Sequence, residues 1–419
     1  MLAILRLSLL LLTCPTFMLA QDSSLLAEIH ESFAPYGSIE AFDNDDGIRE
    51  LSVLLREAVD EGEFRRLIRE AQKYGPVTRL SLHDPSKLRS IEALSGLPLE
   101  HLTIFRPDSV TDLSPLKGMQ IRRLTLSAFP SDEVVFGGPT NVSALQGMPL
   151  DTLLLEGLSV LTDLSPLAGA PITFLSLDHL PNVTDLSPLE GMPIDYLFLG
   201  SLPQIRDITA LNGMPLNLVV LEDLPITSIG PLQSSPIALL TLNKLDALDD
   251  FSPLAELELL KLDLLNLNNM TDLSVLSDLA LNSIQIDNLP SVTDLSPLPG
   301  ERLQTISLKD LPELTTLDGL NVSALRDLDL LRLENLRDIS AIEDAPLETV
   351  RLRTLMSLSD ISALQGKSFK YLELWQLYAV TEVEQINQVN GEELFVSALK
   401  NLETVAPLLG RFNVTEISD

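Results

Sequence analysis

The sequence predicts a solenoid, in which short coils of equal length stack along one axis and share one continuous core. Two observations predict this fold class: the phrase TDLSPL recurs along the chain, and degenerate copies of it follow at a nearly constant step. The copies begin at positions 89, 111, 140, 162, 184, 206, 227, 249, 271, 293, 315, 337, 359, 381 and 403. The step is 22 residues, except for 29 after position 111 and 21 after position 206. About 15 coils over residues 77–408 therefore form a repeat array.

The unit that leads to position 184 shows how one coil is built. Leu175 and Leu177 alternate around Ser176, which is the period-2 pattern of a short strand. Ser187 is a favourable N-cap residue, and Pro188 suits the first position of a helical turn. A Gly-Met-Pro sequence then ends the turn and leads into the next strand. One such coil cannot bury its leucines alone, so we expect successive coils to bury them against each other.

The pattern LxLxxLPxVTDLSPLxGMPL resembles the 22-residue bacterial leucine-rich repeat of the internalins and of other exported bacterial repeat proteins. The resemblance implies a leucine-rich-repeat solenoid: a right-handed α/β-type coil with a parallel β-sheet on its concave face and short 3-10 or turn segments on its convex face. One departure concerns the position after the strand, where internalin repeats usually carry Asn. Here that position mostly holds Leu180, Leu202, Leu245 or Leu311, which predicts a buried leucine ladder in place of an asparagine ladder. The resemblance implies the fold and not a specific internalin role.

Residues 1–20 have the features of a secretory signal peptide: one early Arg, an apolar run broken by Pro15, and a small residue at Ala20. This predicts a secreted, periplasmic or cell-surface protein. A buried N-terminal helix is the alternative. The stretch LLTC also resembles a lipoprotein box, so lipid anchoring through Cys14 is a second, weaker possibility.

Residues 21–76 do not repeat, and we expect a small helical N-terminal cap that shields the open end of the core. Apolar residues from Ile48 to Val59 are spaced for one helical face, and Phe64–Tyr74 predicts a second helix. An independent binding domain is the alternative. At the other end, residues 409–419 predict a capping edge strand or a frayed tail.

The composition is acidic, with 28 Lys and Arg against 60 Asp and Glu and a formal charge of −32. Such a surface repels phosphate backbones, which disfavours nucleic-acid binding. The excess of acidic side chains can serve solubility alone or attract a cationic partner. No later apolar run is long enough for a membrane span. We expect a monomer.

The sequence contains no signature of an enzyme. Gly-rich phosphate loops, a GxSxG elbow and kinase motifs are absent, so we expect neither catalysis nor a cofactor. His83 and His101 would lie on adjacent strands, which permits a weak metal site, but two solvated histidines are the simpler interpretation. The Asp of each TDLSPL phrase forms a ladder that could bind calcium. Its place before a Ser-Pro turn favours local hydrogen bonding to the backbone instead.

Candidate binding residues are those that differ between copies and flank the inward leucines, because they line the concave sheet. In coils five and six these are Phe174, Tyr196 and Phe198, beside Leu154, Leu218 and Val220. Near the C-terminal end, the same face is expected to carry Asp327, Asp329, Arg332, Arg351, Arg353, Tyr371 and Trp375. Aromatic and Arg side chains are typical anchors of protein interfaces. Each cluster could also be a set of scattered surface residues.

The one long step contains an insertion with Val134, Val135 and Phe136 before two glycines. This loop either folds back onto the solenoid or is presented to a partner. The sequence as a whole predicts an exported, non-catalytic repeat protein that binds a protein or peptide on its concave face. A structural or envelope-associated protein without a discrete ligand is the main alternative, and a glycan-binding surface protein is another.

Overall fold

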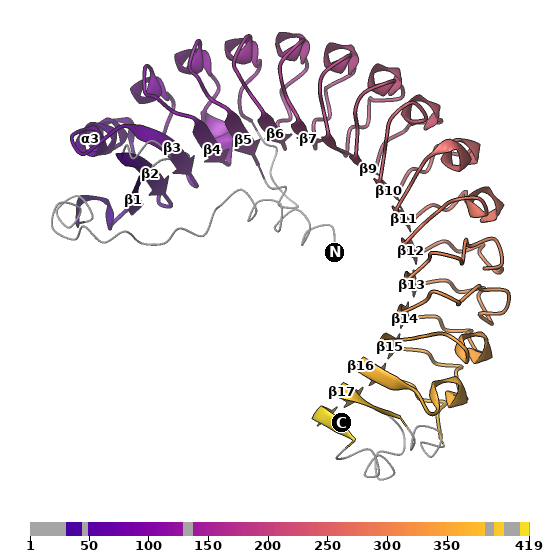
Figure 1. Cartoon of the computed structure of the whole chain (residues 1–419). Coiled ribbons are helices and arrows are strands. Elements are labelled where there is room, and N and C mark those ends of the chain that lie inside the picture. The colour runs from indigo at the N-terminus through magenta and orange to yellow at the C-terminus, as the bar shows by residue number, and fades with distance from the viewer. Residues whose placement is uncertain (1–30, 44–48, 129–136, 382–388, 398–410, 419) are drawn as a thin grey trace. The chain divides into compact units, whose positions relative to one another are not determined.

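The computed structural model describes residues 31–43, 49–128, 137–381, 389–397 and 411–418. The chain separates into two compact units, Met1–Ile172 and Thr173–Asp419, called unit 1 and unit 2 below. In each unit the coils of a leucine-rich-repeat solenoid each add one short strand to a sheet, and a 3-10 or turn segment lies on the opposite side of most coils (Figure 1).

Unit 1 contains a hairpin, one helix and the first coils of the repeat. Its elements are β1 (Gly37–Asp43), β2 (Arg49–Leu55), α3 (Glu61–Gln72), β3 (Val77–Leu82), β4 (His101–Phe105), β5 (Arg123–Ser127) and β6 (Thr152–Glu156). Strands β1 and β2 pair antiparallel, and β2 to β6 pair in parallel in chain order. Its 3-10 turns are η1 (Glu92–Leu94), η2 (Pro107–Ser109), η3 (Ser114–Leu116), η4 (Ser143–Leu145) and η5 (Ser165–Leu167).

Unit 2 consists of parallel strands that pair in chain order from β7 to β18. The strands are β7 (Phe174–Asp178), β8 (Tyr196–Gly200), β9 (Leu218–Glu222), β10 (Leu239–Asn243), β11 (Lys261–Leu265), β12 (Ser283–Asp287), β13 (Thr305–Lys309), β14 (Asp327–Leu331), β15 (Thr349–Arg353), β16 (Ser368–Trp375), β17 (Asn390–Ser397) and β18 (Phe412–Ser418). The 3-10 turns are η6 (Ser187–Leu189), η7 (Thr209–Leu211), η8 (Gly230–Leu232), η9 (Ser252–Glu256), η10 (Ser274–Leu276), η11 (Ser340–Ile342) and η12 (Ser362–Leu364).

The core of each unit is a stack of the inward leucines. In β8, for example, Leu197 and Leu199 are 1% and 0% exposed, while Tyr196 points outward at 38%. The leucines after the strands, such as Leu180 and Leu202, are also buried and form the predicted ladder. Burying a leucine side chain contributes about 1.5–3 kcal/mol, so the repeated positions stabilise the stack and the outward ones are left to vary.

The TDLSPL phrase builds the turn, although by a different cap from the one predicted. Ser187 does not cap the turn; it is the first residue of η6. The cap is the carboxylate of Asp185, which accepts hydrogen bonds from the Ser187 backbone N–H at 2.8 Å and from its hydroxyl at 2.6 Å. These bonds hold the pKa of Asp185 below its usual value. The predicted local hydrogen bonding to the backbone is therefore confirmed for this turn and for its equivalents.

The N-terminal cap differs from the predicted pair of helices. The second helix is present as α3, which Asp60 caps by accepting from the Glu63 backbone N–H. The prediction of a first helix from Ile48 to Val59 is wrong, because residues 49–55 form strand β2. Leu51, Val53 and Leu55 of this strand are buried, so its apolar residues also fit an alternating pattern. The parallel ladder with β3 then offers these residues more contacts than an isolated helical turn. At the C-terminal end, β18 pairs with β17.

Candidate binding surface

The strand face of unit 2 is defined here as the outward side chains of β7–β16. They are the first, third and fifth residues of each five-residue strand and the equivalent Tyr371, Glu373 and Trp375 of β16. Parallel pairing aligns them in three rows that run from strand to strand, because neighbouring strands lie about 4.8 Å apart. Within unit 2 this face lies on the inner side of the bend (Figure 1).

The first part of this face, across β7–β10, has an apolar first row and a polar third row, and is called the aromatic region. In the first row, Phe174, Tyr196, Leu218 and Leu239 pair in register. The rings of Phe174 and Tyr196 stack, with centroids 6.1 Å apart and planes inclined by 25°. Phe198 lies next to Val220 in the second row. The structure therefore brings together the three aromatic residues that the sequence singled out.

Gly200 shapes the aromatic region, and sequence reasoning missed it. A Cβ atom at this position would lie 2.7 Å from the Phe198 ring and 2.6 Å from Oδ1 of Asp178. Asp178 is only 3% exposed, and its Oδ1 is 2.8 Å from Nδ1 of His179. The absence of a side chain at Gly200 therefore leaves space for the Phe198 ring and for the buried Asp178 carboxylate. The available signal was a glycine at the end of a strand, where the other strands of the face carry a side chain.

The second part of the face, across β11–β16, is called the ion-paired region because its cations contact carboxylates. Nη2 of Arg353 lies 2.7 Å from both carboxylate oxygens of Asp329. Nε of Arg351 is 3.8 Å from Glu373, and its guanidinium lies 5.0 Å from the centre of the Tyr371 ring. Burial among these charges raises the pKa of Tyr371.

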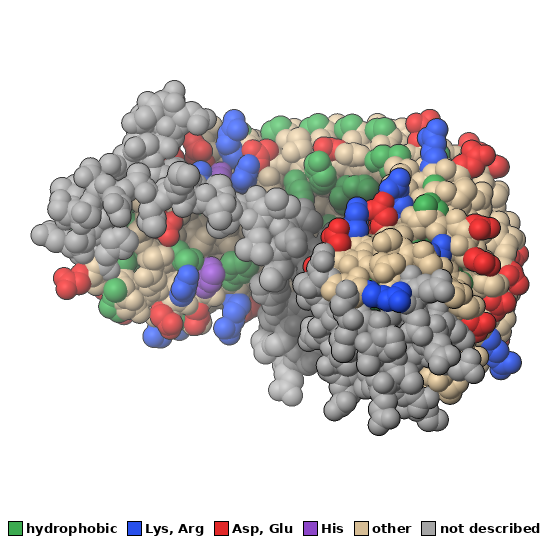
Figure 2. Space-filling model, turned by 60° about the horizontal axis from the view of Figure 1, so that its bottom comes forward, with side chains coloured by type: hydrophobic (Ala, Val, Ile, Leu, Met, Phe, Trp, Pro, Cys, Tyr) green, Lys and Arg blue, Asp and Glu red, His purple; other side chains and the backbone are tan. Residues whose placement is uncertain are grey.

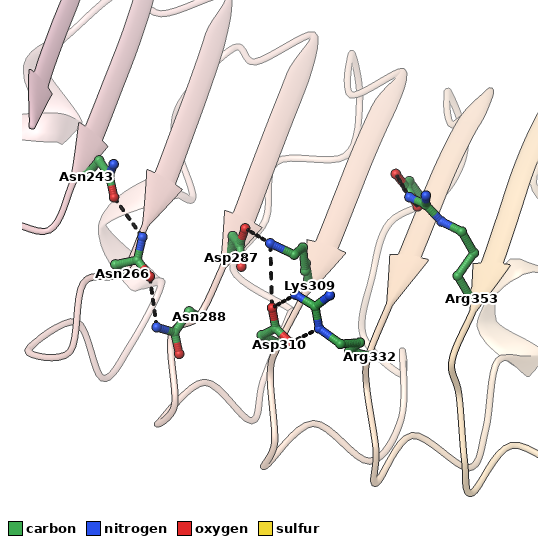
Figure 3. A network of polar contacts seen from close by, with 9 residues as sticks. Asn243, Asn266, Asp287, Asn288, Lys309, Asp310, Arg332 and Arg353 are labelled. Atoms are coloured by element: carbon green, nitrogen blue, oxygen red, sulfur yellow. Dashed lines mark hydrogen bonds and ion pairs between the residues drawn. The ribbon is translucent and has the colours of Figure 1, made fainter. Parts of the chain in front are cut away.

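Arg332 does not lie on the strand face, where the sequence predicted it. It follows β14 in the left-handed conformation, with φ 52°, and lies off the strand face. Its Nε and Nη2 bond Asp310 at 2.6 and 2.5 Å (Figure 3). Lys309 joins Asp287 to the same group, at 2.5 Å from Asp287 and 3.6 Å from Asp310. The Arg332 guanidinium holds the pKa of Asp310 below its usual value.

Along the end of the strands, the left-handed residues form polar contacts from coil to coil. Two of them, Asn266 and Asn288, form an amide chain with Asn243, the last residue of β10, through bonds of 2.7 and 2.9 Å (Figure 3). Asp223 pairs with Lys244 at 3.1 Å in the same position. The amide chain was not predicted, since Asn266 and Asn288 occupy a position that other coils fill with His, Ser or Thr.

Trp375 and Tyr378 are the exposed aromatic residues near the end of the face, at 37% and 42% exposure. Trp375 lies in the third row beside Arg353, whereas Tyr378 follows β16 and lies off the sheet. Figure 2 shows acidic and basic side chains lying side by side on the described surface. The predicted cationic anchors are therefore neutralised within the protein, and Trp375 is the exposed aromatic group among them.

His83 and His101 do not form a metal site with each other. Strand register pairs Arg79 with His101 and Leu82 with Ile104, so His83 and His101 lie at opposite ends of their strands, about 13 Å apart. The weak metal-site alternative is wrong for this pair. The described residues contain no group of three or more His, Cys, Asp or Glu placed to hold a metal ion. Burial, aided by nearby Arg side chains, lowers the pKa of His101 to about 4.

Several predictions from the sequence fall outside the described residues. These are the signal peptide 1–20 with Cys14 and the insertion residues Val134, Val135 and Phe136. No helix in the described part of the chain is long and apolar enough to cross a bilayer.

Comparison with known proteins gives structural neighbours only. No family model matches the chain, and no curated protein matches it. An internalin, InlF, from Listeria monocytogenes is similar at 20% identity over 88% of this chain and 82% of that chain, with a TM-score of 0.33. The functional domain of InlJ from Listeria monocytogenes, whose structure includes a cysteine ladder, is similar at 17% identity over 77% and 69%, with a TM-score of 0.45. The leucine-rich-repeat fold itself rests on the strand pairing and burial described above.

Proposed function

We propose that this protein is an exported, non-catalytic repeat protein that binds a protein or peptide partner through the strand face of unit 2. The observation that carries the proposal is the aromatic region. Tyr196 is 38% exposed, stacks on Phe174, and adjoins further apolar side chains on β9 and β10. Phe174, Leu218 and Leu239 are half-buried, so the row presents a contiguous, partly exposed apolar surface. Contiguous apolar surface marks interaction sites more often than single exposed residues do.

The aromatic region would supply most of the binding free energy. Large aromatic side chains in the centre of an interface dominate its energetics, and their burial needs no compensating ion pair. The ion-paired region would contribute less, because each of its guanidiniums already pairs with a carboxylate. Paired charges of this kind influence partner choice and the encounter rate more than affinity.

A photo-crosslinking amino acid at Leu218 tests the location of the site. We expect the purified full-length protein to crosslink one partner from native extract, which mass spectrometry identifies. The double variant Tyr196→Ala/Phe198→Ala should lose that crosslink while its circular-dichroism spectrum stays unchanged. The matched control carries the crosslinker at Glu190, an exposed residue on the turn side. Equal capture from both positions would contradict the proposal.

Two further measurements separate the alternatives. Binding on a glycan array that disappears in the same double variant would favour a glycan-binding protein. N-terminal sequencing of the native protein tests export, since a chain that begins at Met1 would contradict removal of residues 1–20.

A further inference from the structure

Two tyrosines on the strand face differ in what covers their rings. The Arg351 guanidinium covers Tyr371 from 5.0 Å, so a cation on the same face already occupies that ring. Tyr196 contacts Phe174 on one side, and among the described residues no Lys or Arg covers its ring. The strand face therefore has a cation–π contact at Tyr371, whereas no cation of the described residues covers the ring of Tyr196.

The charges around the strand face favour an incoming cation over an anion. Each Lys and Arg of this face and its strand-end loops lies within 4 Å of a carboxylate: Lys244, Lys261, Lys309, Arg332, Arg351 and Arg353. An anionic partner would therefore have to break an existing ion pair. The whole chain carries a formal charge of −32, which attracts basic partners.

Asp195 is the acidic residue that adjoins Tyr196 in the chain, and its side chain is half-buried. It directly precedes Tyr196, and its backbone carbonyl accepts from Asn217 and Leu218 at 2.8 and 3.1 Å, which fixes the chain there. In the described part of the chain no Lys or Arg pairs with the Asp195 carboxylate. An aromatic face and a carboxylate on consecutive residues suit the ammonium or guanidinium group of a side chain.

We propose that the partner is a basic polypeptide segment, which places a Lys or Arg side chain over Tyr196 with Asp195 as its counter-charge. The inference rests on the proposed binding function and specifies its ligand. The aliphatic stem of that side chain lies along Leu218 and Leu239, which continue the Tyr196 row. The charged end meets the ring and the carboxylate at the start of β8.

Titration calorimetry with defined peptides tests this inference on the full chain. The probe is a decapeptide of alternating Lys and Ser, and its fully Nε-acetylated form has the same length without the charge. Tyr196→Leu keeps an apolar residue, as in β9 and β10, and removes the ring. We expect it to weaken binding of the lysine peptide about 2- to 5-fold at physiological salt. Asp195→Asn should weaken it by a similar factor.

Matched controls distinguish this site from general attraction to an acidic protein. Tyr378→Leu removes another exposed ring, and Glu190→Gln removes another exposed acid. We expect neither to change the affinity, and the acetylated peptide to be insensitive to Tyr196→Leu. Equal weakening by the control variants, or no measurable binding of the lysine peptide, would overturn the inference. If Tyr196→Ala/Phe198→Ala still abolishes partner crosslinking in that case, the proposed function stands and only the cationic ligand is wrong.

Discussion

The aromatic region and the ion-paired region occupy one continuous row of strands and differ most clearly in their outward residues. Their inward positions are the same: Leu199 in β8 and Leu330 in β14 are both 0% exposed. Outward, β8 presents Tyr196 and Phe198, whereas β14 presents Asp327 and Asp329. The repeat keeps the core constant and allows the surface to change from apolar to charged within one sheet.

The difference shows which surface is left for a partner. In the ion-paired region, Arg353 already pairs with Asp329 through Nη2, so a partner would gain little by replacing that contact. In the aromatic region, Tyr196 remains exposed despite its contact with Phe174. A partner that buries exposed apolar area gains binding free energy, whereas a partner that contacts an existing salt bridge gains little.

The largest expected effect concerns the shared core. Leu199→Ala and Leu330→Ala should each lower the free energy of unfolding by about 2–5 kcal/mol, because each leaves a cavity in the leucine stack. Since the two sites are equivalent, urea denaturation should give similar values for both. A difference of more than about 2 kcal/mol would show that the two regions do not share one core design.

A smaller effect is expected at Gly200. A methyl group at this position would collide with the Phe198 ring and the Asp178 carboxylate, so Gly200→Ala should destabilise the protein by about 1–3 kcal/mol. Gly230→Ala, at a turn where the added Cβ would meet no atom closer than 3.3 Å, is the matched control. Thermal denaturation compares the two. Equal stability of both variants would contradict a close fit of Phe198 over Gly200.

The smallest effect is a pH dependence of the Arg332–Asp310 pair, at the strand ends beside the ion-paired region. Arg332 holds the pKa of Asp310 below its value in the unfolded chain, so the ionised carboxylate stabilises the folded protein above about pH 4. This contribution is lost as the pH falls through the lowered pKa. Asp310→Asn should therefore be less stable than the native protein at pH 6, and the difference should vanish near pH 2. A pH-independent difference in urea denaturation would contradict this account.

The sequence predicted the repeat well because every coil restates the same inward leucines. It placed Phe174, Tyr196 and Phe198 on neighbouring strands because register follows from the constant step. It did not predict that Arg353 crosses diagonally to Asp329, since side-chain direction is not contained in the spacing. It took residues 49–55 for a helix because their apolar residues fit both periods, and pairing with β1 and β3 decided between them.

The central claim is that a partner binds the aromatic region rather than the ion-paired region. The partner that crosslinking identifies is purified, and its affinity for two double variants is measured by titration, which tests the claim directly. Tyr196→Ala/Phe198→Ala should weaken binding more than 10-fold, in line with the loss of two interface anchors of about 1 kcal/mol or more each. Arg351→Ala/Trp375→Ala should weaken it less than about 3-fold. The reverse order, or equal losses in both variants, would contradict the account.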